Sequence, residues 1–244
     1  MITWQQVVLP PAVIADGYAA GEGYMEQTTN WLIAHLPQFQ HEKRVIPVAQ
    51  ALNEMSRGTP ICSHFLYETH ARTDYLVFSD PVLHLKPIRL FLTPDKLSTL
   101  RYAMRDGMVD LELMTNQNRL SIGMPIGFRF DDSLVPGFST FISSQLTHSA
   151  GTIKQVVRMY EANRIDGFIS YQTNVNYYRH ADALTREIIA VPIMGVSTRP
   201  LPVSCSGDKE RAQEIIEAIN ALLADPDNRA ELNRFYTRWA DVSS

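Results

Sequence analysis

Residues Thr69 to Pro81, T-H-A-R-T-D-Y-L-V-F-S-D-P, decide the fold, because they place Arg72 at a fixed sequence spacing from a strand-like run that ends in Phe-Ser-Asp-Pro. Arginine presents five N–H donors in a planar fork that can pair with a carboxylate through two hydrogen bonds. It also keeps its charge at any ordinary pH. The alternative for Arg72 is an ordinary surface ion pair with Glu68 or Asp74, since such pairs are common. The segment makes Arg72 the first candidate for holding an anionic ligand.

Length and charge limit the classes of function. A chain of 244 residues can form one large domain or two of ordinary size. With 22 basic and 26 acidic residues and no block of Lys/Arg, the sequence argues against a nucleic-acid partner. No apolar run approaches the roughly 18 to 20 residues that cross a bilayer. No signal-peptide pattern precedes the first strand-like segment.

Strand-like and helix-like segments alternate along the chain, and no internal repeat is visible. The strand-like segments are rich in apolar and β-branched residues, and we expect them at 2–4, near 43, at 61–66, 75–78, 90–92, 119–123, 164–171 and 191–196. The helix-like segments carry apolar residues at a period near 3.6, and we expect them at 24–36, before 57, and at 96–105, 151–162, 209–224 and 230–240. This alternation predicts an α/β architecture with much of the sheet parallel.

The segment around Arg72 resembles the pattern T-x-x-R-x-x-x-x-x-F-S-x-P of the family 3 extracellular solute-binding proteins. G-E-G-Y-M-E-Q at 21–27 and N-R-I-D-G-F-I-S-Y at 163–171 resemble two further motifs of that family. The chain is similar above all to an uncharacterised subgroup with an I-T-W start and a cysteine before the arginine segment. The resemblance implies the two-lobed type II periplasmic binding fold, with mixed, mostly parallel sheets flanked by helices and a ligand cleft between the lobes.

The resemblance also implies how the chain is divided and where the protein works. Lobe 1 would comprise residues 1–86 and 196–244, and lobe 2 residues 87–195, with the chain passing twice between them. The protein would be a periplasmic monomer, with its signal peptide removed, that binds a small ligand without a cofactor. An ABC permease or a membrane receptor would be its partner.

Site residues in the first lobe follow from the same resemblance. In the family the arginine of this segment holds the carboxylate of the ligand, which implies that role for Arg72. The segments that contain Trp4 and Tyr67 would lie at the cleft, and His64 is close to them in sequence. Core packing is the alternative for each aromatic residue, because aromatic side chains dominate cores as well as sites.

A second anion site is implied in the other lobe. The stretch 121–132, S-I-G-M-P-I-G-F-R-F-D-D, resembles the strand and turn from which family members offer backbone N–H groups to the ligand. Free N–H groups at a helix N-terminus suit an anion. Gly127 and Phe128 would lie in this turn, and Arg129 would be a second guanidinium if it faces the ligand. The alternative is that Arg129 pairs with a neighbouring acidic residue at the surface.

Tyr171 departs from the family pattern. Amino-acid-binding members have an acidic residue at about this place, which neutralises the ammonium group of the ligand. A phenol does not supply that charge, and a buried ammonium without a carboxylate partner is strongly disfavoured. The sequence therefore disfavours a free α-amino acid as the ligand, unless Glu22, Glu26 or Asp166 reaches it.

The two cysteines offer a hypothesis about the compartment. In the implied fold, the strands that carry Cys62 and Cys205 are neighbours in one sheet. A disulfide between them would fit an oxidising periplasm, and two buried free thiols are the alternative.

Motifs for catalysis and for metal binding are missing. The sequence has no G-x-S-x-G elbow, no phosphate loop of the G-x-x-x-x-G-K-[ST] type and no H-E-x-x-H helix, and its seven histidines show no metal-binding spacing. Together with the resemblance, which implies a solute-binding protein, the leading hypothesis is a non-enzymatic binding protein that captures a small carboxylate-bearing anion for an ABC-type importer. A sensory module and a small dehydratase or related lyase on the same fold are the alternatives.

Overall fold

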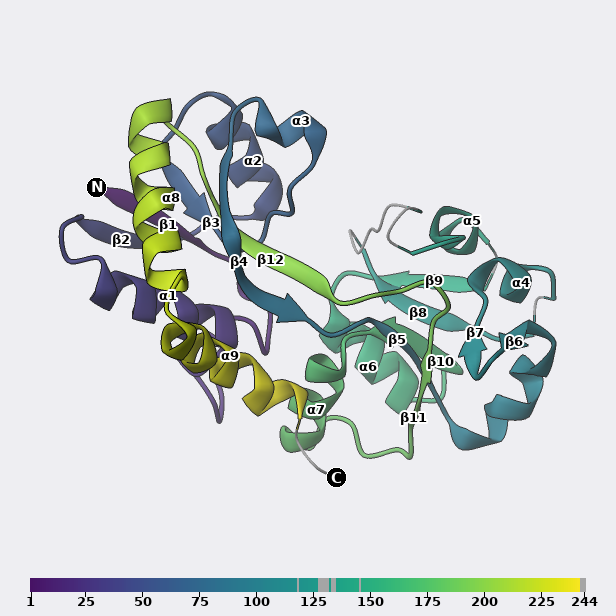
Figure 1. The fold of residues 1–244 in the computed structure, drawn as a ribbon. Coiled ribbons are helices and arrows are strands. Elements are labelled where there is room, and N and C mark those ends of the chain that lie inside the picture. Colours follow the sequence, from purple (N-terminus) through teal and green to yellow (C-terminus); the bar gives the residue numbers. More distant parts are fainter. Residues whose placement is uncertain (118, 127–131, 133–134, 145, 242–244) are drawn as a thin grey trace. The chain divides into compact units, whose positions relative to one another are not determined.

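The computed structural model describes residues 1–117, 119–126, 132, 135–144 and 146–241 (Figure 1). The chain divides into two compact units, which we call unit 1 and unit 2. Unit 1 comprises Met1–Leu85 and Arg199–Ser244, and unit 2 comprises Lys86–Thr198. The sequence placed the corresponding boundaries after residues 86 and 195.

Unit 1 is built on a five-stranded sheet with the order β2-β1-β3-β12-β4. Its strands are β1 (Ile2–Gln6), β2 (His41–Val45), β3 (Ile61–Ser63), β4 (Val77–Leu85) and β12 (Arg199–Cys205). Its helices are α1 (Tyr24–His35), α2 (Val48–Ser56), α3 (His70–Thr73), α8 (Lys209–Leu223) and α9 (Pro226–Ala240). Helix α8 packs on β4 and β12, and α9 packs on α1 (Figure 1).

Unit 2 is built on a five-stranded sheet with the order β11-β5-β10-β8-β9 and a short hairpin. The sheet strands are β5 (Arg89–Leu92), β8 (Ile122–Pro125), β9 (Thr147–Ala150), β10 (Gly167–Ser170) and β11 (Ile189–Pro192). The hairpin pairs β6 (Met104–Arg105) with β7 (Met108–Val109). The helices are the 3-10 helix η1 (Pro94–Ala103), α4 (Leu111–Thr115), α5 (Phe138–Ile142), α6 (Ile153–Glu161) and α7 (Gln172–His180).

The two sheets share one topology. In unit 1, β1 lies between β2 and β3 and is parallel to both, and in unit 2, β8 lies in the same way between β9 and β10. We count the strands from β2 in unit 1 and from β9 in unit 2. The fourth strand, β12 in unit 1 and β5 in unit 2, is antiparallel to both of its neighbours. The fifth strand therefore runs in the direction of the first three. This pattern confirms the predicted α/β class with mixed, mostly parallel sheets.

Several elements differ from their predicted extent. The strand predicted at 61–66 ends at Ser63, because the Ser63 hydroxyl accepts a hydrogen bond from the N–H of Phe65 (3.0 Å) and turns the chain. The strand predicted at 75–78 continues to Leu85 through Pro81. Proline is tolerated there because β4 is an edge strand whose register with β12 shifts near Pro202. The helix predicted at 96–105 is the 3-10 helix η1.

A disulfide joins Cys62 on β3 to Cys205 on β12, with an S–S distance of 2.01 Å. The two residues stand opposite each other in the antiparallel pair, and their Cα atoms are 4.2 Å apart. The two cysteines are 143 residues apart in sequence, and the covalent loop that the bond closes contains all residues of unit 2.

Each unit has an apolar core of its own. In unit 2 the core gathers fully buried side chains from the sheet and from its helices, among them Leu90, Leu100, Ile122, Phe138 and Ile169. In unit 1 one cluster packs α2 against β3 through Ala51, Met55 and Ile61. Among the helices that the structure describes, none is long and apolar enough to cross a membrane.

Candidate functional site

The topology singles out one edge of each sheet. In open α/β sheets ligands bind outside the carboxyl ends of the strands, at the point where the strand order reverses. In unit 1 this point lies between β1 and β3, so that the following segments, 7–23 and 64–69, flank it. In unit 2 it lies between β8 and β10.

Arg72 lies at this edge of unit 1, on the short helix α3 that follows the 64–69 segment. The Thr69 carbonyl accepts the backbone N–H groups of Arg72 (2.9 Å) and Thr73 (3.2 Å), which starts the helix. The half-buried Arg72 side chain donates from Nη1 to the backbone carbonyl of Tyr67 at 2.7 Å. Within the described part of the chain, its guanidinium forms no ion pair with Glu68 or Asp74. The guanidinium is thus oriented by a neutral group.

Tyr67 brings a second arginine to the same place. The guanidinium carbon of Arg199 lies 3.3 Å from the centre of the Tyr67 ring, within the range of a cation–π contact. Arg199 is the first residue of β12, and both side chains are half-buried. No motif in the sequence marks Arg199. The pairing of β12 with β3 and β4 brings it to the 64–69 segment.

Trp4 lies in the core of unit 1, with 0% of its surface exposed. Its ring lies nearly parallel to those of His41 and His64, with centroid distances of 6.3 and 5.6 Å. The indole N–H donates to Nδ1 of His41 (3.1 Å), so that His41 must donate through Nε2 to the carbonyl of Leu36 (2.8 Å). Trp4 therefore takes the core position that the sequence left open as the alternative to a ligand contact.

His64 occupies an unusual position directly after β3. Its ring is 1% exposed, and among the described residues neither ring nitrogen has a hydrogen-bond partner. Burial lowers the pKa of His64 to about 4, because the charged imidazolium would lose its solvation. At neutral pH, His64 is therefore a neutral ring stacked on Trp4.

Three phenol groups lie near the same edge. The rings of Tyr24, on α1, and Tyr236, on α9, meet edge to face at 5.3 Å. Burial raises the pKa of Tyr24, and the neighbouring Tyr236 and Tyr67 raise it further. The Tyr24 phenol therefore remains protonated at neutral pH. The N–H groups that begin α1 are already bonded to the carbonyls of Pro11 and Ala12, so this helix start offers them to no ligand.

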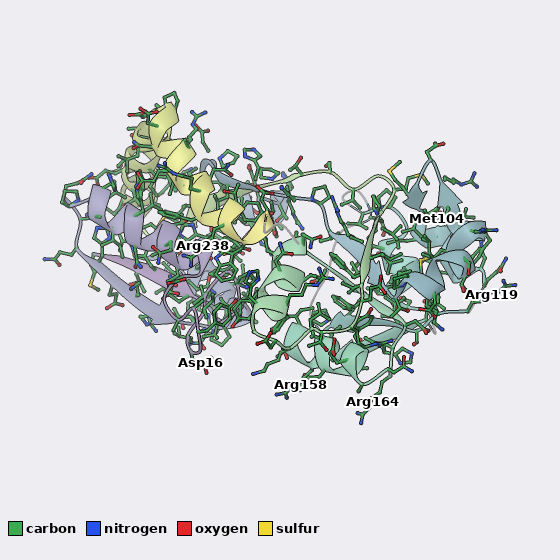
Figure 2. The ribbon with its side chains drawn as sticks, turned by 90° about the horizontal axis from the view of Figure 1, so that it is seen from below. Asp16, Met104, Arg119, Arg158, Arg164 and Arg238 are labelled. Atoms are coloured by element: carbon green, nitrogen blue, oxygen red, sulfur yellow. A yellow bond between two sulfur atoms is a disulfide. The ribbon has the colours of Figure 1, made fainter. Side chains whose placement is uncertain are left out.

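Two of the three candidate acids are engaged elsewhere. Glu22 pairs with Arg238, which projects from α9 (Figure 2). Asp166 forms an ion pair with Lys96 at 3.0 Å and accepts hydrogen bonds from the N–H (2.8 Å) and hydroxyl (3.2 Å) of Ser121. Although burial raises the pKa of Asp166, these contacts outweigh it and lower the pKa overall. Asp166 thus joins β10 to the start of β8.

Glu26, the third candidate acid, differs from the other two. It lies in the first turn of α1, and its Oε2 atom is buried with no hydrogen-bond partner among the described residues. A buried carboxylate oxygen without a partner is costly. Of the three acids that the sequence named for a ligand ammonium, Glu26 is the one with a buried carboxylate oxygen that has no hydrogen-bond partner among the described residues.

In unit 2, Tyr171 lies at the carboxyl end of β10, where it is the N-cap residue of α7. It is half-buried against the core of this unit. Buried polar side chains surround the start of α7, and Ser170 accepts a hydrogen bond from the Asn174 amide at 2.8 Å. The three other predicted residues of this unit, Gly127, Phe128 and Arg129, lie outside the described residues.

A hollow of about 420 Å³ lies on unit 2 beside α6. Its lining includes Gly151 and Gln155 near the start of the helix, together with Arg158 and Arg164. Both arginines are exposed and point outward (Figure 2). Among the described residues, no group of three His, Cys, Asp or Glu side chains could hold a metal ion.

No family model and no curated protein matches the sequence. Solved structures, in contrast, match along nearly the whole chain. The probable amino-acid ABC transporter extracellular-binding protein YtmK of Bacillus subtilis is 13% identical, with a TM-score of 0.66 over 98% of this chain and 97% of its own. The GluR0 ligand-binding core in complex with L-glutamate is 11% identical, with a TM-score of 0.66 over 98% and 97%. An ancestral amino acid-binding protein, a precursor of cyclohexadienyl dehydratase, is 13% identical, with a TM-score of 0.66 over 98% and 94%.

These likenesses establish the fold. The chain has the type II periplasmic binding fold of amino-acid-binding proteins, as its sequence predicts. At 10 to 14% identity the comparison extends to the fold alone, and function has to be argued from the site.

Proposed function

We propose that this protein is a periplasmic solute-binding protein that captures a small carboxylate-bearing ligand for an ABC-type importer. The main support for this proposal is the position of Arg72 at the carboxyl edge of the unit 1 sheet, where the Tyr67 carbonyl orients the Arg72 guanidinium. Within the described part of the chain this is the one polar contact of the Arg72 side chain. The fork therefore keeps N–H donors for a carboxylate.

The ligand is amino-acid-like in its carboxylate. The neighbouring structures support this class, because they are amino-acid-binding proteins by name. If the ligand also carries an ammonium group, Glu26 is the acid proposed to bind that group, since Glu22 and Asp166 are already paired. In that case Glu26→Gln weakens the binding of the amino acid. The same substitution leaves unchanged the binding of a matched carboxylic acid that has no amino group.

The proposed location outside the cytoplasm is supported by the Cys62–Cys205 disulfide. Such bonds persist in the oxidising periplasm and are rare in the cytosol. The likeness to an extracellular-binding protein supports the same location. Thiol counting on denatured, unreduced protein tests the bond, and two free thiols would remove this argument.

The proposed function is tested by a thermal-shift screen of wild type and Arg72→Ala. The panel contains amino acids, dicarboxylates, aromatic carboxylates, phosphate esters and short peptides. A ligand present at about 100 times its dissociation constant stabilises the native state by roughly 2.7 kcal/mol. We expect a carboxylate to stabilise the wild type and to lose that effect in Arg72→Ala. A ligand that stabilises both proteins equally would remove Arg72 as the anchor.

A sensory role is the second candidate, favoured by the equal likeness to the ligand-binding core of GluR0. In that case the ligand-bound protein acts on a membrane receptor. Pull-down with the ligand present separates the two roles, since transport predicts recovery of a permease and sensing predicts recovery of a receptor or kinase. Turnover of a carboxylated ring substrate would instead show that the protein is an enzyme.

A further inference from the structure

The hollow beside α6 gathers positive charge without a compensating acid. Its lining consists of Ala150, Gly151, Gln155, Arg158, Met159 and Arg164, all of them in unit 2. The two arginines keep their charge at any ordinary pH, and no lining residue is acidic. The volume of about 420 Å³ lies in the range of about 300 to 1,000 Å³ that is usual for small-ligand pockets. The hollow is therefore large enough for a small anionic molecule.

The end of α6 holds the two arginines in place. Arg158 lies in the last turn of the helix, and Arg164 follows its end. The backbone N–H of Arg164 donates to the carbonyl of Met159 (2.9 Å), and that of Asn163, whose φ is 56°, donates to the carbonyl of Tyr160 (3.0 Å). This pair of hydrogen bonds is the Schellman motif that ends many helices. It fixes the backbone from which the Arg164 side chain projects (Figure 2).

Neither arginine side chain is needed to complete the helix end. The three carbonyls at 158–160 already accept backbone N–H groups, and Arg186 also donates from Nη1 to the carbonyl of Tyr160. Among the described residues, the side chains of Arg158 and Arg164 form no hydrogen bond and no ion pair. Both guanidinium groups thus keep their N–H donors for a bound molecule.

The acidic residues nearest in sequence are engaged by other groups. Glu161 accepts hydrogen bonds from the backbone N–H groups of Thr185 and Arg186, each at 2.9 Å, and from the Thr185 hydroxyl at 2.9 Å. Asp166 forms its ion pair with Lys96 at 3.0 Å. Neither acid pairs with an arginine of the hollow, so its positive charge is open to an anion from outside.

The start of α6 adds a neutral donor. Thr152 and Gln155 form a capping box, in which the Thr152 N–H donates to Oε1 of Gln155 (3.0 Å) and the Gln155 N–H donates to the Thr152 hydroxyl (3.2 Å). A Cβ atom at Gly151 would lie 2.8 Å from Oε1 of Gln155, so glycine is what lets this side chain fold back. The Gln155 amide nitrogen keeps two N–H donors that no described residue accepts.

We propose that the hollow beside α6 is a second binding site of this protein, and that it takes a phosphate monoester. A guanidinium fork pairs with phosphate oxygens through two hydrogen bonds. Two forks match a phosphate monoester, which carries close to two negative charges at neutral pH. Gln155 donates to a further phosphate oxygen, and the Met159 side chain offers an apolar contact to the organic group. An anion of one charge leaves one arginine unpaired and is bound more weakly.

The test is a titration of the full chain with methyl phosphate at constant ionic strength, followed by calorimetry and by amide NMR spectra. Dimethyl phosphate is the matched probe, because it has the same phosphate group with only one negative charge. We expect methyl phosphate to bind more tightly than dimethyl phosphate and to shift the signals of Gly151, Gln155 and Arg164 most. The double variant Arg158→Gln with Arg164→Gln should weaken the binding of methyl phosphate at least about tenfold.

Two variants serve as controls. Arg101 is an exposed arginine of unit 2 that lies on η1 and is not part of the lining. Arg101→Gln removes one positive charge from the same unit and should leave the binding of methyl phosphate at the wild-type value. Arg72→Ala, in unit 1, should do the same. Loss of methyl phosphate binding in Arg72→Ala would assign the phosphate to the edge of the unit 1 sheet and overturn the proposal.

A phosphate monoester can come from a soluble metabolite or from a lipid headgroup. Vesicles of phosphatidylcholine that contain phosphatidic acid present the same group on a surface. Co-sedimentation with these vesicles that requires Arg158 and Arg164 assigns the site to a lipid, and methyl phosphate binding without co-sedimentation assigns it to a soluble ester. If methyl phosphate does not bind the wild type, or binds the double variant equally well, the proposal is wrong.

Discussion

The buried ring of His64 ties the stability of unit 1 to pH. Its pKa in the folded protein is about 4, below the usual value of about 6.5 for the unfolded chain. Below pH 6.5 the unfolded state therefore binds more protons, and stability falls as the pH drops toward 4. The difference in pKa corresponds to about 3 kcal/mol. We expect wild type to lose about that much more unfolding free energy between pH 7 and pH 4 than His64→Phe, measured by urea denaturation.

A control at His84 separates this effect from the general acid sensitivity of the chain. His84 is exposed on β4, so His84→Gln leaves the difference between pH 7 and pH 4 at the wild-type value. If His64→Phe and wild type lose stability in parallel, the buried ring is not the source of the acid sensitivity.

At the same scale, the sequence predicted one half of the candidate site and missed the other. Arg72 stands in a motif of fixed spacing, and the structure places it at the carboxyl edge of the unit 1 sheet. Arg199 has no local signal, because its contact with Tyr67 exists only through the pairing of β12 with strands more than a hundred residues earlier. Periodicity within a segment carries no information about such long-range pairing.

At the scale of elements, the disulfide between β3 and β12 should contribute strongly to stability. The two cysteines are 143 residues apart, and removing a native disulfide typically costs about 2 to 5 kcal/mol, the entropic part growing with the length of the loop. We expect a reducing agent to lower the unfolding free energy of wild type by this amount. The double variant Cys62→Ser with Cys205→Ser should be equally destabilised and insensitive to the reducing agent. Identical denaturation curves with and without reductant would contradict the prediction.

The elements that the sequence predicts well are those with a strong local pattern. The helix expected at 24–36 is α1, and the helix expected at 209–224 is α8, each within a residue of its predicted ends. The missed elements are short or polar, such as α4, α5, β9 and α7, and they form where tertiary packing supports them. The early end of β3 depends on a single hydrogen bond from the Phe65 N–H to the Ser63 hydroxyl, which hydrophobic periodicity does not report.

At the scale of the whole molecule, unit 2 should fold by itself. Lys86–Thr198 is one continuous stretch with its own five-stranded sheet and its own apolar core. We expect the isolated segment 86–198 to give a mixed α/β circular dichroism spectrum and one cooperative thermal transition. Unit 1 is split into two stretches, so residues 1–85 alone lack β12, the partner of both β3 and β4. If the segment 1–85 alone unfolded cooperatively and the segment 86–198 showed no cooperative thermal transition, the division into these two folding units would be wrong.

The common topology of the two sheets also belongs to this scale. The spatial order β2-β1-β3-β12 in unit 1 is matched by β9-β8-β10-β5 in unit 2, with the antiparallel strand in the fourth place each time, although no repeat is visible in the sequence. Many different apolar residues can fill equivalent core positions, so that topology persists where sequence similarity does not. The α/β class could therefore be predicted from the alternation of elements, whereas the internal likeness of the two units could not.

The proposed function depends on Arg72 as the residue that anchors the carboxylate of a small ligand. The most direct test is calorimetric titration of a ligand found by the thermal-shift screen into wild type, Arg72→Lys and Arg72→Ala. We predict that Arg72→Ala loses about 2 to 5 kcal/mol of binding free energy, the cost of removing one partner of a buried charge pair. Arg72→Lys should lose less, because it keeps the charge without the planar fork. Binding by Arg72→Ala within twofold of the wild-type affinity would show that Arg72 is not the anchor.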